Sequence, residues 1–174
     1  MLDYKPIEGV TVIGLGHKAR VGKDTTAGFI IGLTGGAAER FGFADDLYSI
    51  ARVMFGMTTK DPTLLQVLGT EVFRKKDPDT WINSLYWKLQ DRKPSIAVIT
   101  DCRFPNEAAF VKALGGTMVK IVRLNADDSV FQAPDRNPLH PSESALNDYQ
   151  GWDHVLVARS GDLQSLYTQV ELVL

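Results

Sequence analysis

The chain has 174 residues, of which 44% are hydrophobic and 23% charged, and its formal net charge is -2. This length and composition are typical of one globular domain with a sizeable core. The near-neutral charge argues against a general surface for binding nucleic acid. Cys102 is the single cysteine, which excludes an intrachain disulfide and fits a reducing compartment.

No apolar run in the sequence approaches the roughly 20 residues that a membrane-spanning helix needs. Residues 1–6 carry no signal-peptide pattern. We therefore expect a cytoplasmic protein with no membrane partner.

Strands and helices are predicted to alternate along the chain. In order, the patterns predict a strand at 10–15, a helix at 23–33, a strand at 40–44, helices at 45–55, 62–75 and 80–91, a strand at 96–100, a helix from 105 to the glycines at 115–116, strands at 117–122 and 154–157, and a final helix from about 162. This alternation predicts an α/β fold with a central parallel sheet of about five strands and helices on both faces.

Residues 125–150 do not fit this alternation of strands and helices. The segment is polar, rich in Asp, Pro and Asn, and long for a plain connection. We expect a small lid here, with Arg136 and His140 closing over phosphates to exclude water. The alternative is a surface loop whose charges have no such role. The spacing of Asp135, His140 and Glu143 is not a structural-zinc pattern.

The strongest chemical signal is the stretch Gly14–Thr26 (GLGHKARVGKDTT), which follows the first predicted strand. A strand, a loop with free backbone N–H groups and a helix N-terminus in this order form a phosphate-binding arrangement. Gly22 lets the backbone approach phosphates closely, and Lys23 can reach the β- and γ-phosphates of ATP. The predicted ATP-binding residues are Gly16, His17, Lys18, Gly22, Lys23, Asp24, Thr25 and Thr26.

The loop departs from the usual pattern at two positions. His17 replaces the first glycine, and Asp24 stands where Ser or Thr usually binds magnesium. We interpret His17 as a hydrogen-bonding loop residue rather than a catalytic base. Arg20 is a candidate for stabilising transferred charge. The alternative for Lys18 and Arg20 is a solvated surface charge.

Five segments together resemble the bacteriophage deoxynucleoside monophosphate kinases, a family of P-loop nucleotide kinases. They are residues 22–27 (GKDTTA), 43–47 (FADDL), 64–71 (LLQVLGTE) with Arg74, 100–108 (TDCRFPNEA) and 140–143 (HPSE). The last two are much more specific than the phosphate loop, and the resemblance extends from about Val10 to the final helix. It implies a three-layer P-loop kinase fold over 1–174, ATP as donor, Mg²⁺, a deoxynucleoside monophosphate as acceptor, and a role in supplying viral DNA precursors in the host cytoplasm.

Four residues are predicted to act on the transferred phosphoryl group: Lys23, Arg20, Asp101 and Arg103. Asp101 ends a buried strand, where a carboxylate can hold magnesium through water, with Thr25 as its partner. The alternative, equally weighted, is that Asp101 caps the next helix. A salt bridge between Asp101 and Arg103 is the simpler reading of that pair.

The resemblance places the acceptor in a helical region at about 45–92, with Arg74 gripping its phosphate as a bidentate cation. The alternative for Arg74 is a solvated charge beside two lysines. Asp45 would orient the acceptor or cap its helix, with capping favoured. Gln66 and Glu71 would read the base or sugar. Trp81, Trp87 and Cys102 are predicted to be core residues.

Other functions remain open at this point. A metabolite kinase of the dephospho-coenzyme A type and a non-catalytic nucleotide-binding module share the same loop. The pI of about 5.9 argues against an ATPase that processes nucleic acid. The apolar helix faces allow a homodimer without requiring one.

Overall fold

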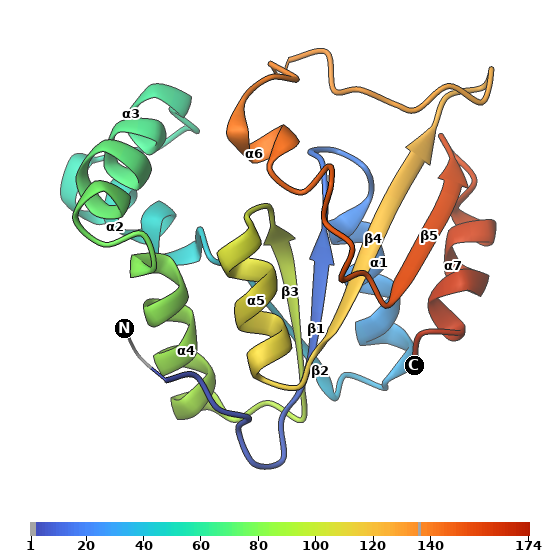
Figure 1. Ribbon diagram of the computed structural model, residues 1–174, viewed down its shortest axis with the longest axis horizontal. Helices are drawn as coiled ribbons and strands as arrows, with labels where there is room; N and C mark the ends of the chain where they lie inside the picture. Colours follow the sequence, from blue (N-terminus) through green and yellow to red (C-terminus); the bar gives the residue numbers. More distant parts are fainter. Residues whose placement is uncertain (1–2, 136) are drawn as a thin grey trace.

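The computed structural model describes residues 3–135 and 137–174. Its strands β1 (Thr11–Gly16), β2 (Ala38–Phe41), β3 (Ile96–Cys102), β4 (Thr117–Leu124) and β5 (His154–Arg159) form one sheet. All pairs are parallel, in the order β2-β3-β1-β4-β5 (Figure 1), which confirms the predicted sheet. Because β1 is the central strand, the loop that follows it leaves from the middle of the sheet.

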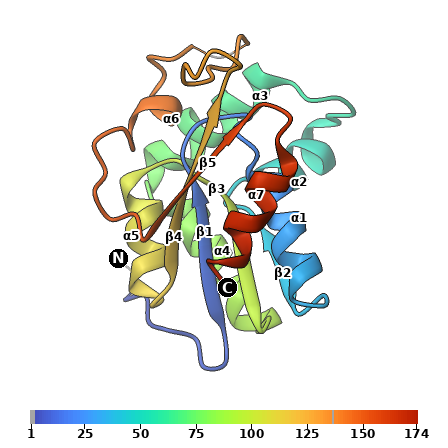
Figure 2. The ribbon, with the colours of Figure 1, turned by 90° about the vertical axis from the view of Figure 1, so that its right-hand side faces the viewer.

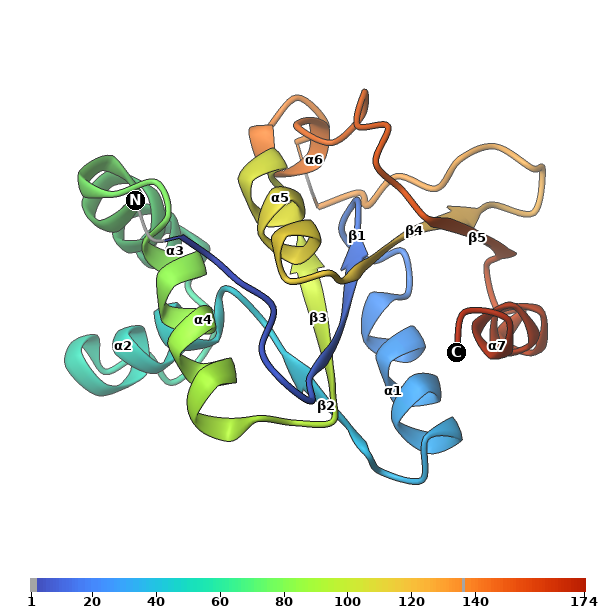
Figure 3. The ribbon, with the colours of Figure 1, turned by 60° about the horizontal axis from the view of Figure 1, so that its bottom comes forward.

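Helices cover both faces of the sheet, which makes three layers (Figures 2 and 3). Helices α1 (Lys23–Leu33) and α7 (Leu163–Glu171) lie on one face, and α4 (Thr80–Arg92) and α5 (Pro105–Ala113) on the other. Along β3, Ala97 and Ile99 join the core under α4 and α5, whereas Val98 joins the core under α1 and α7. This alternation explains why the strand reads as a continuous apolar run.

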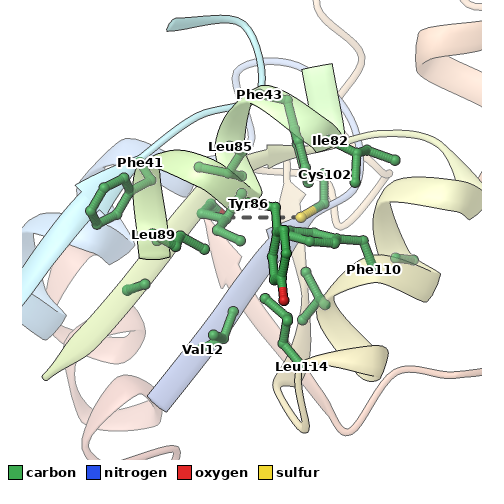
Figure 4. Close-up of a cluster of buried hydrophobic side chains, with 14 of the residues drawn as sticks. Val12, Phe41, Phe43, Ile82, Leu85, Tyr86, Leu89, Cys102, Phe110 and Leu114 are labelled. Atoms are coloured by element: carbon green, nitrogen blue, oxygen red, sulfur yellow. Dashed lines mark hydrogen bonds between the residues drawn. The ribbon is translucent and has the colours of Figure 1, made fainter. Parts of the chain in front are cut away.

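The core beside α4 and α5 is aromatic (Figure 4). Phe110 packs edge-on against Phe43 and Tyr86, and Cys102 is fully buried as predicted. Trp81 is also buried, but Trp87 is 60% exposed, so its prediction as a core residue was wrong. Residue 87 falls outside the i, i+4 stripe of α4 that faces the core.

Helices α2 (Asp45–Phe55) and α3 (Pro62–Gln66) lie to one side of the sheet (Figure 1). The helix predicted at 62–75 begins as expected, with the Asp61 side chain accepting hydrogen bonds from two backbone N–H groups of its first turn. It then widens into a π-helix, η1 (Val67–Arg74). Gly69 of η1 packs against Leu47 of α2, where an added Cβ would lie 2.9 Å from a side-chain carbon.

Two further differences from the predicted elements concern the end of β2 and the segment 125–150. β2 spans 38–41 rather than 40–44, because the chain leaves the sheet at Gly42. A short helix, α6 (Pro141–Ser144), lies within the predicted lid segment. None of the helices in the described part of the chain has the length and apolar character of a membrane span.

Candidate functional site

The phosphate loop connects the central strand β1 to α1. Gly22 precedes the helix with φ 106°, a left-handed conformation that favours glycine. Lys23 is 7% exposed, and its Nζ donates a hydrogen bond to the carbonyl oxygen of Lys18 across the loop. Burial, reinforced by the nearby Arg103 guanidinium, lowers the pKa of Lys23 to about 8. The ammonium is therefore held inside the loop and poised to neutralise an incoming anion.

The four residues of the first turn of α1 differ in accessibility. Asp24 and Thr25 are exposed to solvent, so their oxygens are free to meet a ligand. Thr26 is fully buried, and its hydroxyl donates to the Gly22 carbonyl at 3.0 Å. In this structure Thr26 thus joins the loop to its helix and does not line a cavity.

Two cavities meet at this loop. The larger, of about 880 Å³, lies between the loop, α2, α3, η1 and the segment 125–150. The smaller, of about 370 Å³, lies between residues 20–25, Arg123 and residues 158–163, which run from the end of β5 to the start of α7. Lys23 and Asp24 line both cavities, so the start of α1 forms the boundary between them.

Arg74 lies in the wall of the larger cavity, and it is not the solvated charge of the alternative interpretation. Its Nη2 donates to Oε1 of the buried Glu107 at 2.8 Å, and its guanidinium carbon lies 4.6 Å from the centre of the Phe104 ring. The side chain is 23% exposed. Burial raises the pKa of Glu107, and the Arg74 charge opposes that shift.

Arg103 lines the same cavity, held by a different carboxylate. Its Nη1 donates to Oε1 of Glu143 at 2.5 Å, and the other oxygen of Glu143 accepts the N–H of Ala19 in the phosphate loop at 2.9 Å. Glu143 is 6% exposed. Its carboxylate therefore joins three segments: the phosphate loop, the chain after β3 and the segment 125–150. The salt bridge between Asp101 and Arg103, which was the alternative interpretation of this pair, does not form.

Asp101 does not cap the helix that follows it. Its two oxygens accept hydrogen bonds from the backbone N–H groups of Phe43 and Ala44, at 2.8 and 3.0 Å. Burial raises the pKa of Asp101, and these two hydrogen bonds act in the opposite direction. The start of α5 is instead capped by the Glu107 carboxylate, which accepts the N–H groups of Arg103 and Phe104.

The remaining acceptor candidates separate into two groups. Asp45 and Gln66 line the larger cavity, whereas Glu71 is exposed and lies outside its lining. The favoured role of Asp45 as a helix cap was wrong. Its Oδ1 instead accepts a 2.7 Å hydrogen bond from Arg40, because Ala44 occupies the cap position.

Gly16, His17 and Lys18 do not line either of these cavities. An added Cβ at Gly16 would lie 2.6 Å from the Trp152 ring, so this glycine permits close packing. His17 is 8% exposed, and its Nε2 hydrogen-bonds to Oδ1 of Asn147 at 2.9 Å, which confirms it as a hydrogen-bonding loop residue. Burial and nearby lysines lower the pKa of His17 to about 4. His17 and Lys18 line a third cavity, of about 300 Å³, on another side of the loop.

The segment 125–150 contacts the phosphate loop at several points. Arg20 pairs with Asp135 at 2.7 Å, and both side chains are largely exposed. His140 begins α6, where its Nδ1 accepts the N–H of Ser142 at 3.2 Å, and it lines the larger cavity. Arg136 lies outside the described residues.

The turn between β5 and α7, residues 160–162, was missed by the sequence analysis. It follows β5 at the carboxyl edge of the sheet and contains Gly161 with φ 89°. Its position after a parallel strand was the available signal, because ligands of such sheets bind beyond the strand ends. Among residues 3–135 and 137–174, no group of three or more His, Cys, Asp or Glu side chains is arranged to hold a metal ion.

No family model matches the chain. A protein of Acanthamoeba polyphaga mimivirus, named "Putative deoxynucleotide monophosphate kinase", is 32% identical over 130 residues, which are 67% of this chain and 61% of that protein. The chain thus spans about three fifths of the length of this relative.

Proposed function

We propose that this protein transfers the γ-phosphoryl group of ATP to a deoxynucleoside monophosphate. A phosphate oxygen of the acceptor attacks the γ-phosphorus, the bond from that phosphorus to the β–γ bridging oxygen breaks, and ADP leaves. The observation that carries the proposal is the position of Lys23 at the junction of two cavities. Phosphoryl transfer requires positioning and charge neutralisation at such a junction more than covalent assistance.

The donor half of the proposed site is the smaller cavity with the phosphate loop. The loop and the N-terminus of α1 suit the triphosphate, since free N–H groups and the helix dipole both favour anions. Residues 158–163 and Arg123 form the opposite wall, where a nucleoside would fit. Arg20, which also lines this cavity, is the proposed group that stabilises transferred charge from this side.

The acceptor half is the larger cavity, which Arg74 and Arg103 line. Its other cationic side chains are Lys23, Arg40, Arg52 and Lys60. A guanidinium presents parallel N–H groups that match a phosphate, so Arg74 suits the acceptor monophosphate. Aromatic and aliphatic side chains from α2, α3 and α4 complete the wall, which suits a base. In this proposal residues 45–92 form the acceptor region and 125–150 the lid of a single domain.

The oxygen groups at this junction fit magnesium. Mg²⁺ commonly uses one or two carboxylates, water and substrate phosphates rather than a cage of protein ligands. The exposed hydroxyl of Thr25 and carboxylate of Asp24 are available for this, whereas both oxygens of Asp101 already accept backbone hydrogen bonds. Bound Mg²⁺ would neutralise charge on the phosphates, with Thr25 and Asp24 orienting its water ligands.

The test is ADP release from MgATP with each deoxynucleoside monophosphate, beside the matching ribonucleotides and dephospho-coenzyme A. We expect release only when a deoxynucleoside monophosphate is present. A Lys23→Ala variant should stay folded and lose on the order of 10²-fold or more in turnover, as enzymes do on losing one charge-stabilising group. Release with dephospho-coenzyme A alone, or steady ATP hydrolysis without any acceptor, would refute the proposal.

A further inference from the structure

Two buried glutamates each hold one arginine of the larger cavity. Glu107 is 1% exposed and pairs with Arg74; Glu143 is 6% exposed and pairs with Arg103. A buried carboxylate is costly unless every oxygen is hydrogen-bonded. Both carboxylates meet this requirement in the same way, with one oxygen on a guanidinium and the other on backbone N–H groups.

The Arg74 guanidinium is restrained on two sides. Glu107 receives one of its N–H groups, and the Phe104 ring lies against its face. A guanidinium has five N–H donors in a fixed plane, so this arrangement leaves donors available to the cavity. Arg74 also sits at the end of the π-helix η1, whose wider winding is common at functional sites.

The Arg103 guanidinium is restrained by the segment 125–150. Its Nη1 contacts Glu143 and, at 3.4 Å, the carbonyl oxygen of Ser142. Because Glu143 also holds the N–H of Ala19, the orientation of Arg103 and the shape of the phosphate loop depend on the same carboxylate.

We propose that Glu107 and Glu143 are positioning residues. Glu107 fixes Arg74 for the acceptor phosphate, and Glu143, which also holds the phosphate loop, fixes Arg103 at the side of the larger cavity that faces the triphosphate. The inference rests on the proposed kinase function. Both glutamates also line the larger cavity, and in this proposal each acts on the substrate through its arginine. The two guanidinium groups are thus held by separate carboxylates, although Glu107 also accepts the backbone N–H of Arg103.

Glutamine substitutions separate this role from a purely structural one. In Glu107→Gln the amide oxygen can still accept the backbone N–H groups at the start of α5, while the amide NH₂ cannot pair with Arg74. In Glu143→Gln the oxygen can likewise keep the Ala19 bond while the Arg103 pair is lost. The matched control is Glu39→Gln, which removes a carboxylate that pairs with Arg92 at 2.5 Å on the surface, outside the cavities.

The experiment is a pair of double-mutant cycles, Glu107→Gln with Arg74→Ala and Glu143→Gln with Arg103→Ala. Titration calorimetry measures binding of a deoxynucleoside monophosphate for the first cycle and of MgATP for the second, and steady-state kinetics give KM and kcat. We expect Glu107→Gln to weaken acceptor binding on the order of 10-fold, with MgATP binding nearly unchanged. Glu143→Gln should weaken MgATP binding and leave acceptor binding nearly unchanged. Glu39→Gln should change neither of the two affinities.

The decisive result is the coupling within each cycle. If a glutamate acts through its arginine, its substitution has little further effect once that arginine is alanine. Independent, multiplying effects, or equal losses for both ligands, would overturn the positioning role. The binding measurements test the positioning role even if the wild-type protein transfers no phosphoryl group. A lack of phosphoryl transfer by the wild type would refute the proposed function separately.

Discussion

The carboxylate of Asp101, at the end of β3, accepts a 2.8 Å hydrogen bond from the backbone N–H of Phe43, which follows β2. Its second oxygen accepts the N–H of Ala44 at 3.0 Å. These bonds join the carboxyl ends of two neighbouring strands and fix the chain where α2 begins. One wall of the larger cavity thus depends on a single half-buried side chain.

Replacing this carboxylate should destabilise the fold measurably. In Asp101→Asn one oxygen becomes an NH₂ group that faces a backbone N–H, so one partly buried hydrogen bond is lost. We expect the free energy of unfolding in urea to fall by about 1–3 kcal/mol. The matched control is Asp61→Asn, an exposed cap where asparagine serves almost equally well. Equal changes in the two variants would contradict the assigned role of Asp101.

Nucleotide binding should be accompanied by proton uptake near pH 8. The pKa of Lys23 in the free protein is about 8, so part of the population is neutral at that pH. Bound phosphates favour the ammonium and raise its pKa, so binding of ADP should take up as much as about half a proton per site. Calorimetry at pH 8 in two buffers of different ionisation enthalpy measures this uptake. In Lys23→Arg, which stays charged, the buffer dependence should disappear; its persistence would assign the proton elsewhere.

Removing Arg74 should affect the acceptor far more than ATP. In Arg74→Ala we expect KM for the monophosphate to rise on the order of 10-fold or more, because a charge-assisted contact is lost, while KM for ATP changes little. Steady-state kinetics with each substrate varied in turn give both values. The neighbouring exposed Lys75→Ala is the control and should resemble the wild type. A collapse of ATP affinity instead would show that the donor and acceptor halves are wrongly divided.

Acid should destabilise the protein through His17. Its pKa is lowered to about 4 in the folded state and is about 6.5 when unfolded, so between these values the unfolded chain binds more protons. The stability contributed by neutral His17 is therefore present above about pH 6.5 and lost as the pH falls toward 4. Between pH 7 and pH 5 the wild type should lose about 1–2 kcal/mol more than His17→Gln in urea unfolding. Parallel losses in both proteins would contradict the burial of a neutral histidine.

Local sequence patterns were sufficient for the elements that carry the phosphate loop. Helices at 23–33 and 45–55 were predicted with the bounds that the structure has, because apolar spacing and terminal glycines are short-range signals. The parallel sheet followed from the alternation of strands and helices. The prediction that Lys23 begins α1 required only the order of strand, loop and helix along the chain.

Tertiary structure alone decided which charges meet. Arg74 and Glu107 are 33 residues apart, and Arg103 and Glu143 are 40 apart, so no local pattern could pair them. The same holds for His17, which turns toward Asn147, and for the widening of η1, where α2 packs against Gly69. The sequence by itself determined the position of the candidate phosphate loop, because the order of strand, glycine-containing loop and helix is a local pattern. Which side chains surround it depends on long-range packing, because segments distant in the chain converge at the carboxyl edge of the sheet.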